Sequence, residues 1–228
     1  MKRVVRLTAP LLAVAVLAGC KLNLTADVYS SDVRDAMEGT VGISSPATLA
    51  FQVPSVDRCA EHTAKIREIM AGVLKDFTPK GCKRESMDSF LLADTQLPLF
   101  NSEEAWRKAN ALFGLLLYQK PDRPSIAVAI VLNIQKYGVL TSRMKEKFRQ
   151  TVDLSASKVT LVFNNDERNT SIFAVREVFV NAEPVHGRRD YKLERRHKAN
   201  IRLSDVTTAN LAREGFAAGF TLKGRDKE

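Results

Sequence analysis

The N-terminal segment is the feature that constrains this chain most. Its pattern is that of a targeting signal, so it is not expected to be part of the folded domain. Its first six residues carry three positive charges, residues 7–17 are apolar, and small residues precede Cys20. This order is typical of a secretory signal peptide. The apolar run is far shorter than the roughly 20 residues that a helix needs to cross a bilayer. We therefore expect residues 1–19 to be removed, and residues 20–228 to fold as a single domain.

The end of this segment, Leu17-Ala18-Gly19-Cys20, closely resembles the lipobox of bacterial lipoproteins. The resemblance implies cleavage before Cys20, transfer of a diacylglyceryl group to its thiol, and acylation of the new amino group. Each buried acyl CH₂ contributes about 0.8 kcal/mol, so several chains hold a protein firmly at a membrane where one chain holds it weakly. The alternative is an ordinary signal peptide that is cut nearby, with no anchoring role for Cys20.

The residues after the cysteine bear on where such an anchor would lie. In enterobacterial lipoproteins an aspartate at this position resembles an inner-membrane retention signal. Lys21 stands there instead, so the resemblance favours the outer membrane, with the domain facing the periplasm. Apolar and polar residues alternate over 22–29, which predicts a half-buried strand. Because almost no linker precedes this strand, we expect the domain to sit close to the membrane.

Composition and charge fit a folded extracytoplasmic domain. Hydrophobic residues make up 45% of the chain and charged residues 27%, which is typical of globular and not of disordered proteins. The formal net charge is +9, and Lys2, Arg3 and Arg6 of the signal segment supply three of these charges. A basic domain in this compartment could meet lipid phosphates, lipopolysaccharide or acidic glycans, and we expect no nucleic-acid partner. Moderate basicity is also common in proteins without any such partner.

The cysteine count predicts one disulfide. If Cys20 is lipidated, Cys59 and Cys82 remain, and a pair in an oxidising compartment is expected to be bonded. Such a bond stabilises a protein by roughly 3 kcal/mol in the chain-entropy model. The helix predicted over 58–77 would be about 30 Å long, however, and would separate the two thiols. Either the helix ends early, near Gly72, or the cysteines lie apart.

The same cysteines allow a competing interpretation. Cys59-x-x-His62, with Cys82 beyond it, supplies three metal ligands or a Cys-His pair for nucleophilic catalysis. Structural zinc sites use four protein ligands, and no further Cys-x-x-Cys or His-x-x-x-His is present. We therefore favour the disulfide and expect no metal and no cofactor.

Periodicity predicts an α+β fold, a mainly antiparallel sheet with helices packed on one face. The expected strands are 22–29, 40–53 with a turn near 44–46, 90–100, 112–118, 126–133, 158–163, 172–185, 189–203 and 216–222. The expected helices are 33–38, 58–77, 103–110, part of 136–152, and 205–214.

The densest basic run of the chain lies between residues 188 and 198. Its six Lys and Arg residues are Arg188, Arg189, Lys192, Arg195, Arg196 and Lys198. If the run is one strand, Lys192 and Arg196 share a face. Arginine forks suit phosphate and carboxylate, so we expect these residues to contact an anionic surface. The alternative is a solvated face, or a charged edge strand that blocks aggregation.

No catalytic motif stands out. Gly-x-Ser-x-Gly, P-loop, dinucleotide-binding and zinc-protease patterns are absent, so we predict a non-enzymatic protein. Asp32, Asp35 and Glu38 recur at helical spacing, which we interpret as capping and a solvated face. The alternative of an envelope hydrolase requires a cleft that joins a histidine to acidic residues.

The start of the expected domain carries a second resemblance. Residues 25–32, followed by a Cys-bearing helix and a second Cys, look like an uncharacterised lipoprotein family of enterobacteria and their phages. This resemblance implies no known activity and no catalytic residues. The sequence therefore predicts a membrane-tethered binding protein of the cell envelope, whose partner is an envelope protein, an anionic lipid or lipopolysaccharide. A prophage-encoded lipoprotein that excludes superinfecting phages is the alternative.

Overall fold

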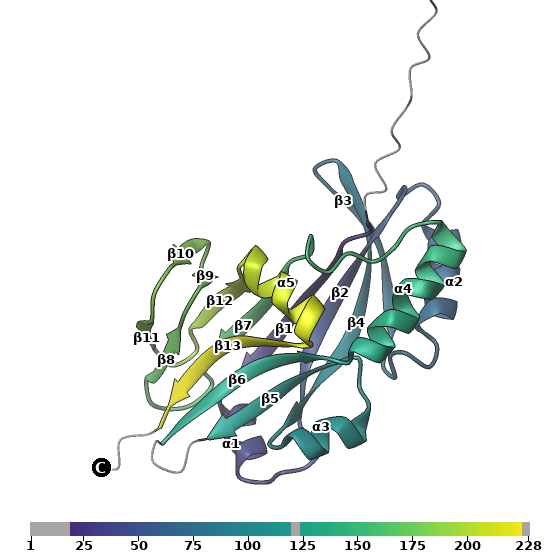
Figure 1. The fold of residues 1–228 in the computed structure, drawn as a ribbon. Helices are drawn as coiled ribbons and strands as arrows, with labels where there is room; N and C mark the ends of the chain where they lie inside the picture. Colours follow the sequence, from purple (N-terminus) through teal and green to yellow (C-terminus); the bar gives the residue numbers. More distant parts are fainter. Residues whose placement is uncertain (1–18, 120–123, 225–228) are drawn as a thin grey trace, which may run out of the picture.

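The computed structural model describes residues 19–119 and 124–224 (Figure 1). Residues 1–18 of the expected signal segment, residues 120–123 and residues 225–228 lie outside the described part. The described residues form 5 helices and 13 strands, with 46% of the residues in strands and 26% in helices. The fold is therefore mostly sheet.

The bounds of the elements follow the chain closely. The strands are β1 (Leu22–Tyr29), β2 (Ser44–Val53), β3 (Thr78–Glu85), β4 (Asp88–Phe100), β5 (Phe113–Gln119), β6 (Ser125–Leu132), β7 (Val159–Asn164), β8 (Ser171–Val175), β9 (Val178–Val180), β10 (Glu183–Val185), β11 (Arg189–Leu193), β12 (Lys198–Leu203) and β13 (Phe216–Lys223). The helices are α1 (Ser30–Met37), α2 (Cys59–Met70), α3 (Glu103–Ala109), α4 (Ile134–Phe148) and α5 (Asp205–Glu214).

All the strands belong to one sheet. Their order is β10-β9-β12-β7-β1-β2-β4-β5-β6-β13-β8-β11, with β3 attached to β4. Only the β1–β7 and β4–β5 pairs are parallel. Strands β10 and β11, at the two ends of this order, are joined through residues 186–188, so the sheet curls into a nearly closed barrel. The mainly antiparallel sheet is confirmed, whereas its near closure was not predicted.

One hydrophobic cluster fills the molecule, running from Cys20 to Leu222. Along β1 the alternate side chains Leu22, Leu24, Ala26 and Val28 are all fully buried, which is the two-residue period that the sequence shows. Helices α1, α2, α4 and α5 each add buried side chains to this cluster. Helix α3 buries none; its Trp106 ring packs 5.5 Å from that of Phe100 on β4. Packing of all the helices on one face stays a prediction.

Helix α2 is shorter than the predicted helix over 58–77. It ends at Met70, and Gly72 adopts φ +75°, so the chain turns and returns along β4 as strand β3. The prediction of one helix over 58–77 is wrong, and the alternative, that the helix ends early near Gly72, is confirmed. Strand β3 was missed because Pro79 and Gly81 resemble helix breakers; the strand accommodates them with a register shift between these two residues.

Three further expectations about the strands are corrected. Strand β2 begins at Ser44, so residues 44–46 are its first residues and do not turn, and residues 40–43 lie outside the strand. The strand expected over 172–185 is broken at Glu177 and again at Asn181-Ala182, all of which adopt positive φ. The strand expected over 189–203 is broken by a turn in which Arg196 has φ +64°. Left-handed residues end the alternation of a strand, and apart from Asn181 these residue types gave no sign of it.

Capping serines mark two helix starts as the sequence predicts. The hydroxyl oxygen of Ser102 accepts a hydrogen bond from the Ala105 amide, and that of Ser204 accepts one from Thr207, both at 3.2 Å. These bonds satisfy amides that a helix start leaves free. Among the described helices, none combines the length and apolarity needed to cross a bilayer.

Candidate functional site

Among the described residues, Cys20 is the first that is bonded into the fold. It lies beside Val152 in a parallel bridge. Its amide donates to the Thr151 carbonyl at 2.6 Å, and its carbonyl accepts from the Asp153 amide at 2.9 Å. Strand β1 begins two residues later. The residue predicted to carry the lipid is thus joined to the domain without a linker.

The thiol of Cys20 is enclosed in this state of the chain. The residue is 4% exposed, and its Sγ donates to Oε1 of Gln150 at 2.7 Å. Burial raises the pKa of the thiol to about 11. Because the thiolate is the nucleophile, a buried neutral thiol is inert.

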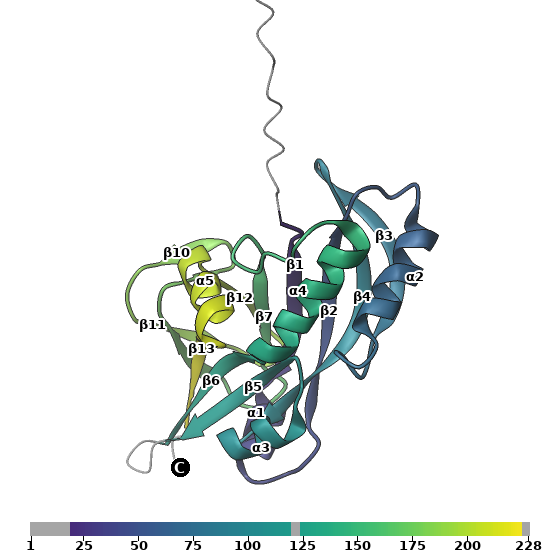
Figure 2. The same cartoon turned by 45° about the vertical axis from the view of Figure 1, so that its right-hand side comes forward.

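The turn between β3 and β4 lies against the same end of the molecule. Nζ of Lys21 contacts a carboxylate oxygen of Asp88 at 2.6 Å, and the Gln52 amide donates to the other oxygen at 2.8 Å. Met87 at the tip of the turn is 98% exposed. Both ribbon views place this turn beside the start of the described chain (Figures 1 and 2). An exposed apolar side chain therefore stands next to the expected anchor.

Cys59 and Cys82 form a disulfide, as predicted, with 5.8 Å between their Cα atoms. The bond ties the first turn of α2 to strand β3. Because both sulfurs are used, neither the metal site nor the Cys-His nucleophile can form in this state. In the described part of the chain, no group of three or more His, Cys, Asp or Glu side chains could hold a metal ion.

The three histidines do not share a site. His62 is 2% exposed, its ring lies 5.8 Å from that of Phe148, and neither ring nitrogen has a hydrogen-bond partner. Burial lowers its pKa, which identifies it as a neutral core residue between α2 and α4. His186 and His197 are exposed in the turns that flank β11.

The six predicted basic residues are all exposed, but they are not on one strand. Arg188 precedes β11, Arg189 and Lys192 lie on it, Arg195 and Arg196 lie in the following turn, and Lys198 begins β12. The prediction that Lys192 and Arg196 share one face of a strand is therefore wrong. Arg189 instead lies over the Tyr191 ring, 5.2 Å from its centroid.

Strand register fixes where the end of this basic segment lies. Lys198 pairs with Asn164 of β7, and Asn164 pairs with Tyr29 at the far end of β1. A strand rises about 3.3 Å per residue, so the step from Leu22 to Tyr29 covers about 23 Å. The turn that carries Arg195 and Arg196 therefore lies at the end of β1 opposite to Cys20.

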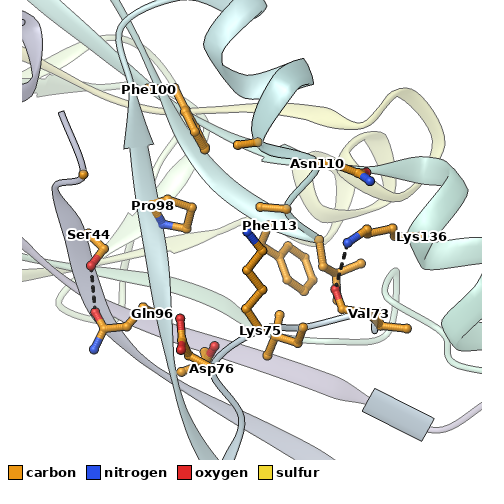
Figure 3. A pocket seen from close by; sticks show the side chains of 16 residues that line it. Ser44, Val73, Lys75, Asp76, Gln96, Pro98, Phe100, Asn110, Phe113 and Lys136 are labelled. Carbon is orange, nitrogen blue, oxygen red and sulfur yellow. Dashed lines mark hydrogen bonds between the residues drawn. The ribbon is translucent and has the colours of Figure 1, made fainter. Parts of the chain in front are cut away.

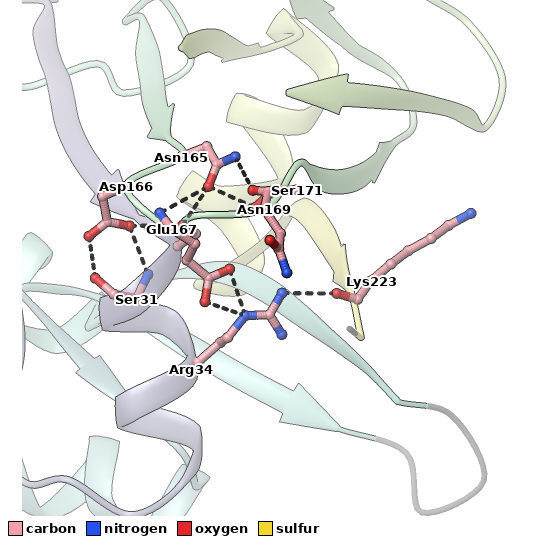
Figure 4. A network of polar contacts seen from close by, with 9 residues as sticks. Ser31, Arg34, Asn165, Asp166, Glu167, Asn169, Ser171 and Lys223 are labelled. Atoms are coloured by element: carbon pink, nitrogen blue, oxygen red, sulfur yellow. Dashed lines mark hydrogen bonds and ion pairs between the residues drawn. The ribbon is translucent and has the colours of Figure 1, made fainter. Parts of the chain in front are cut away.

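A buried polar network holds this distal end together (Figure 4). Asn165, 1% exposed, donates to the Leu193 carbonyl at 2.7 Å and to the Asn169 carbonyl at 2.9 Å. Its carbonyl oxygen accepts from the Ser171 hydroxyl at 3.0 Å. Arg34 of α1 pairs with Glu167 and donates to the Lys223 carbonyl at 3.2 Å. The network joins distant segments and resembles no catalytic arrangement.

Asp166 caps helix α1 from outside its own segment. Its carboxylate accepts from the Ser31 amide at 3.0 Å, from the Ser30 hydroxyl at 2.8 Å, and from the Ser31 hydroxyl. Burial opposes ionisation of Asp166, but these hydrogen bonds outweigh it and lower the pKa. This contact could not be predicted from local sequence patterns, because 135 positions separate the partners.

The sheet is open beside β4, between the end of its pairing with β3 and the start of its pairing with β5 (Figure 3). A cavity of about 290 Å³ occupies this place. It is lined by Gly42, Ser44, Val73, Leu74, Lys75, Asp76, Thr95, Gln96, Pro98, Phe100, Ala109, Asn110, Ala111, Leu112, Phe113 and Lys136. Sequence reasoning missed this site, because its lining comes from five separate segments.

Removing the disulfide tests its contribution to stability. We expect Cys59→Ser/Cys82→Ser to lower the free energy of unfolding by about 3 kcal/mol, because the unfolded chain regains loop entropy. Urea denaturation with and without reductant measures this. The wild type should lose stability on reduction and the double variant should not. Equal stability of the two oxidised proteins would contradict the stabilising role.

Asp166→Asn tests the distal cap. A carboxylate with a lowered pKa stabilises the fold above its unfolded pKa of about 3.9, and this contribution disappears as the pH falls. Burial and the charges of Asp166 and Asp35 raise the pKa of Asp32, so the substitution also relieves repulsion. We therefore expect a net loss of only about 1 kcal/mol at pH 7.

The pH dependence distinguishes this role from a general effect of the substitution. The difference in thermal stability between wild type and Asp166→Asn should shrink between pH 5 and pH 3 (about the window of the carboxyl pKa values). Glu146→Gln, at an exposed position of α4, is the control and should follow the wild type throughout. A difference that grows toward acid would refute the assignment.

Comparison with known proteins identifies the family but no function. The model of a domain of unknown function, DUF7424, matches residues 22–227. No curated protein and no solved structure matches the chain significantly. The matched residues begin with strand β1, directly after the expected anchor, and end beyond β13. The chain therefore belongs to the DUF7424 family, a family of proteins whose function is unknown.

Proposed function

We propose that this protein is a lipid-anchored, non-enzymatic binding protein of the bacterial cell envelope. Its lipid is carried by Cys20, in the outer membrane, and its domain faces the periplasm. The observation that carries the proposal is the position of Cys20: the residue singled out by the lipobox resemblance is also, among the described residues, the first one bonded into the fold. The domain then hangs from its anchor in a fixed orientation.

The bonds of Cys20 are compatible with an acylated amine. Acylation replaces the Gly19–Cys20 peptide by another amide, which keeps the N–H that donates to Thr151. The position of the sulfur atom, in contrast, is not compatible with its modification. Cys20 is 4% exposed and its sulfur lies beside Gln150, which leaves no room for a diacylglyceryl group. We therefore infer that lipidation precedes docking of Cys20, and that Gln150 moves aside in the lipidated protein.

The disulfide supports the same compartment. Disulfides persist in oxidising compartments such as the periplasm, and they are rare in the cytosol. The Cys59–Cys82 bond fits a secreted domain. The exposed Met87 at the anchored end suits contact with the lipid surface, since apolar side chains partition into the interface.

The orientation gives the basic segment, residues 188–198, a different partner from the anchoring membrane. Its turn lies about 23 Å along β1 from the anchored end, beyond the Debye length of about 8 Å at physiological salt. Arginine and lysine at this distal end then face the periplasm. The partner that fits is an acidic surface of another envelope protein.

A binding role also accounts for the chemistry of the described part better than hydrolysis does. None of the cavities described along the surface is lined by a histidine. His62 is buried within the core, and both partner cysteines are bonded to each other. These observations support a non-enzymatic protein.

Replacement of the anchor residue tests attachment. Serine has no sulfur to which the diacylglyceryl group could be attached through a thioether. We therefore expect the Cys20→Ser protein either to move from the membrane fraction to the soluble periplasmic fraction or to keep its signal segment uncleaved. Fractionation with and without salt measures this. Ser86→Cys at the exposed turn is the control, and it should stay in the membrane fraction. Salt-resistant, processed Cys20→Ser protein in the membrane would contradict the anchor.

The role of the basic segment, residues 188–198, is tested with the lipidated protein in phosphatidylglycerol vesicles and with polyglutamate as the acidic probe. We expect the affinity for polyglutamate to fall severalfold between 50 and 200 mM salt, because the Debye length shortens from about 14 to about 7 Å over this range. Arg188→Ala/Arg189→Ala/Arg195→Ala/Arg196→Ala should abolish it.

The control variant removes four cations elsewhere, Lys65, Arg107, Lys147 and Arg213, and should bind polyglutamate as the wild type does. If the basic segment instead lay on the anchoring membrane, anionic vesicles would block the probe and neutral vesicles would not. Such a difference between the two vesicle types would overturn the proposed orientation.

A further inference from the structure

Strand β4 has an open stretch on one edge. Strand β3 pairs with it as far as Asp94, and β5 pairs with it from Leu99 onward. Within the described residues, no strand covers positions 95–98 on this edge. The amide of Leu99 donates to Ile43 on the opposite side, and backbone groups alternate between the two edges of a strand. The N–H and C=O of Gln96 therefore point into the gap.

The cavity beside this open edge contains an unpaired hydroxyl. Thr95 is 6% exposed, and its Oγ1 has no hydrogen-bond partner in the described part of the chain. A buried hydroxyl without a partner destabilises the fold, because it loses its hydrogen bonds to water and gains none in the protein. Such a group is uncommon in a folded core and indicates that something else satisfies it when the cavity is filled.

The lining of the same cavity carries two ammonium groups, those of Lys75 and Lys136, and one carboxylate, that of Asp76, so its net charge is positive. Lys136 is half-buried, and its Nζ contacts only the Val73 carbonyl, at 3.4 Å. Lys75 also lines the cavity (Figure 3). Neither ammonium group forms an ion pair with a carboxylate among residues 19–119 and 124–224. The electrostatic environment therefore favours an anion.

The remaining walls are apolar. Phe113 projects into the space (Figure 3), and Leu112 and Pro98 also line it. Ligand sites combine such walls with a few convergent polar groups, and their volumes start near 300 Å³. About 290 Å³ is room for one amino-acid residue or an acid of similar size.

We propose that this cavity binds a small carboxylate with an apolar body. The carboxylate accepts hydrogen bonds from the ammonium group of Lys136 and from the Thr95 hydroxyl, and the apolar body packs on Phe113. Two sources supply this chemistry: a free apolar acid, or the C-terminal residue of a peptide. A peptide would also pair with the free backbone groups of Gln96, as an added strand does at a sheet edge. The proposal is independent of the lipid anchor.

Three probes test this by calorimetric titration of the full protein. They are acetyl-Phe-Leu with a free carboxylate, the same dipeptide as its C-terminal amide, and 4-phenylbutyrate. We expect the free dipeptide to bind at least about tenfold more tightly than the amide, because a charge-assisted hydrogen bond contributes about 1.5–3 kcal/mol. Binding of both acids indicates a free-acid site, and binding of the peptide alone indicates strand addition. Either result supports the proposal.

Two substitutions place the binding in this cavity. Lys136→Met keeps the length of the side chain and removes its charge, and it should weaken binding of the free dipeptide at least about tenfold. Lys145→Met, on an exposed position of the same helix, is the matched control and should leave binding unchanged.

Thr95→Val removes the unpaired hydroxyl. It should weaken binding while leaving thermal stability equal or higher, because the penalty of the buried hydroxyl disappears. The proposal is overturned if acid and amide bind equally, if no carboxylate binds at millimolar concentration, or if Lys136→Met binds as the wild type does.

Discussion

The pairing of strand β1 is the constraint on which the rest of this structure depends. The strand is bonded on both sides, antiparallel to β2 and parallel to β7, and every second side chain is fully buried. Cys20, two residues before the strand, pairs with Val152, and Tyr29, the last residue of the strand, pairs with Asn164. One strand therefore connects the end expected at the membrane with the end that carries the basic turn. The length of β1 sets their separation, and in the proposed anchoring the direct step from Cys20 to β1 sets the orientation.

The segment between β2 and β5 shows how local departures from regular structure create the candidate binding site. Gly72 stops helix α2, and the Cys59–Cys82 bond holds the returning strand β3 against β4. Strand β3 diverges before β5 arrives, which leaves an open edge beside Thr95 and Lys136. A longer helix, as the sequence suggests, would remove both the disulfide and the gap. The disulfide and the cavity thus have a common origin in the early end of one helix.

The sequence predicts those features that depend on local patterns. Alternation gives strand β1 with its observed bounds, Ser102 and Ser204 mark two helix starts, and cysteine counting gives the disulfide. Features that depend on contacts distant in sequence could not be predicted. Asp166 caps α1 across 135 positions, and the cavity draws its lining from separate segments. The breaks at Glu177 and Arg196 were missed because these residues rarely adopt positive φ.

The central proposal is that a lipidated Cys20 anchors the domain directly to the membrane and that one disulfide stabilises this domain. The intact mass of the protein extracted from membranes, with and without reductant, tests it most directly. We expect the mass of residues 20–228 plus acyl chains, increasing on reduction by the two hydrogens of the broken Cys59–Cys82 bond. A full-length, unacylated mass with three free thiols would contradict both the anchor and the compartment.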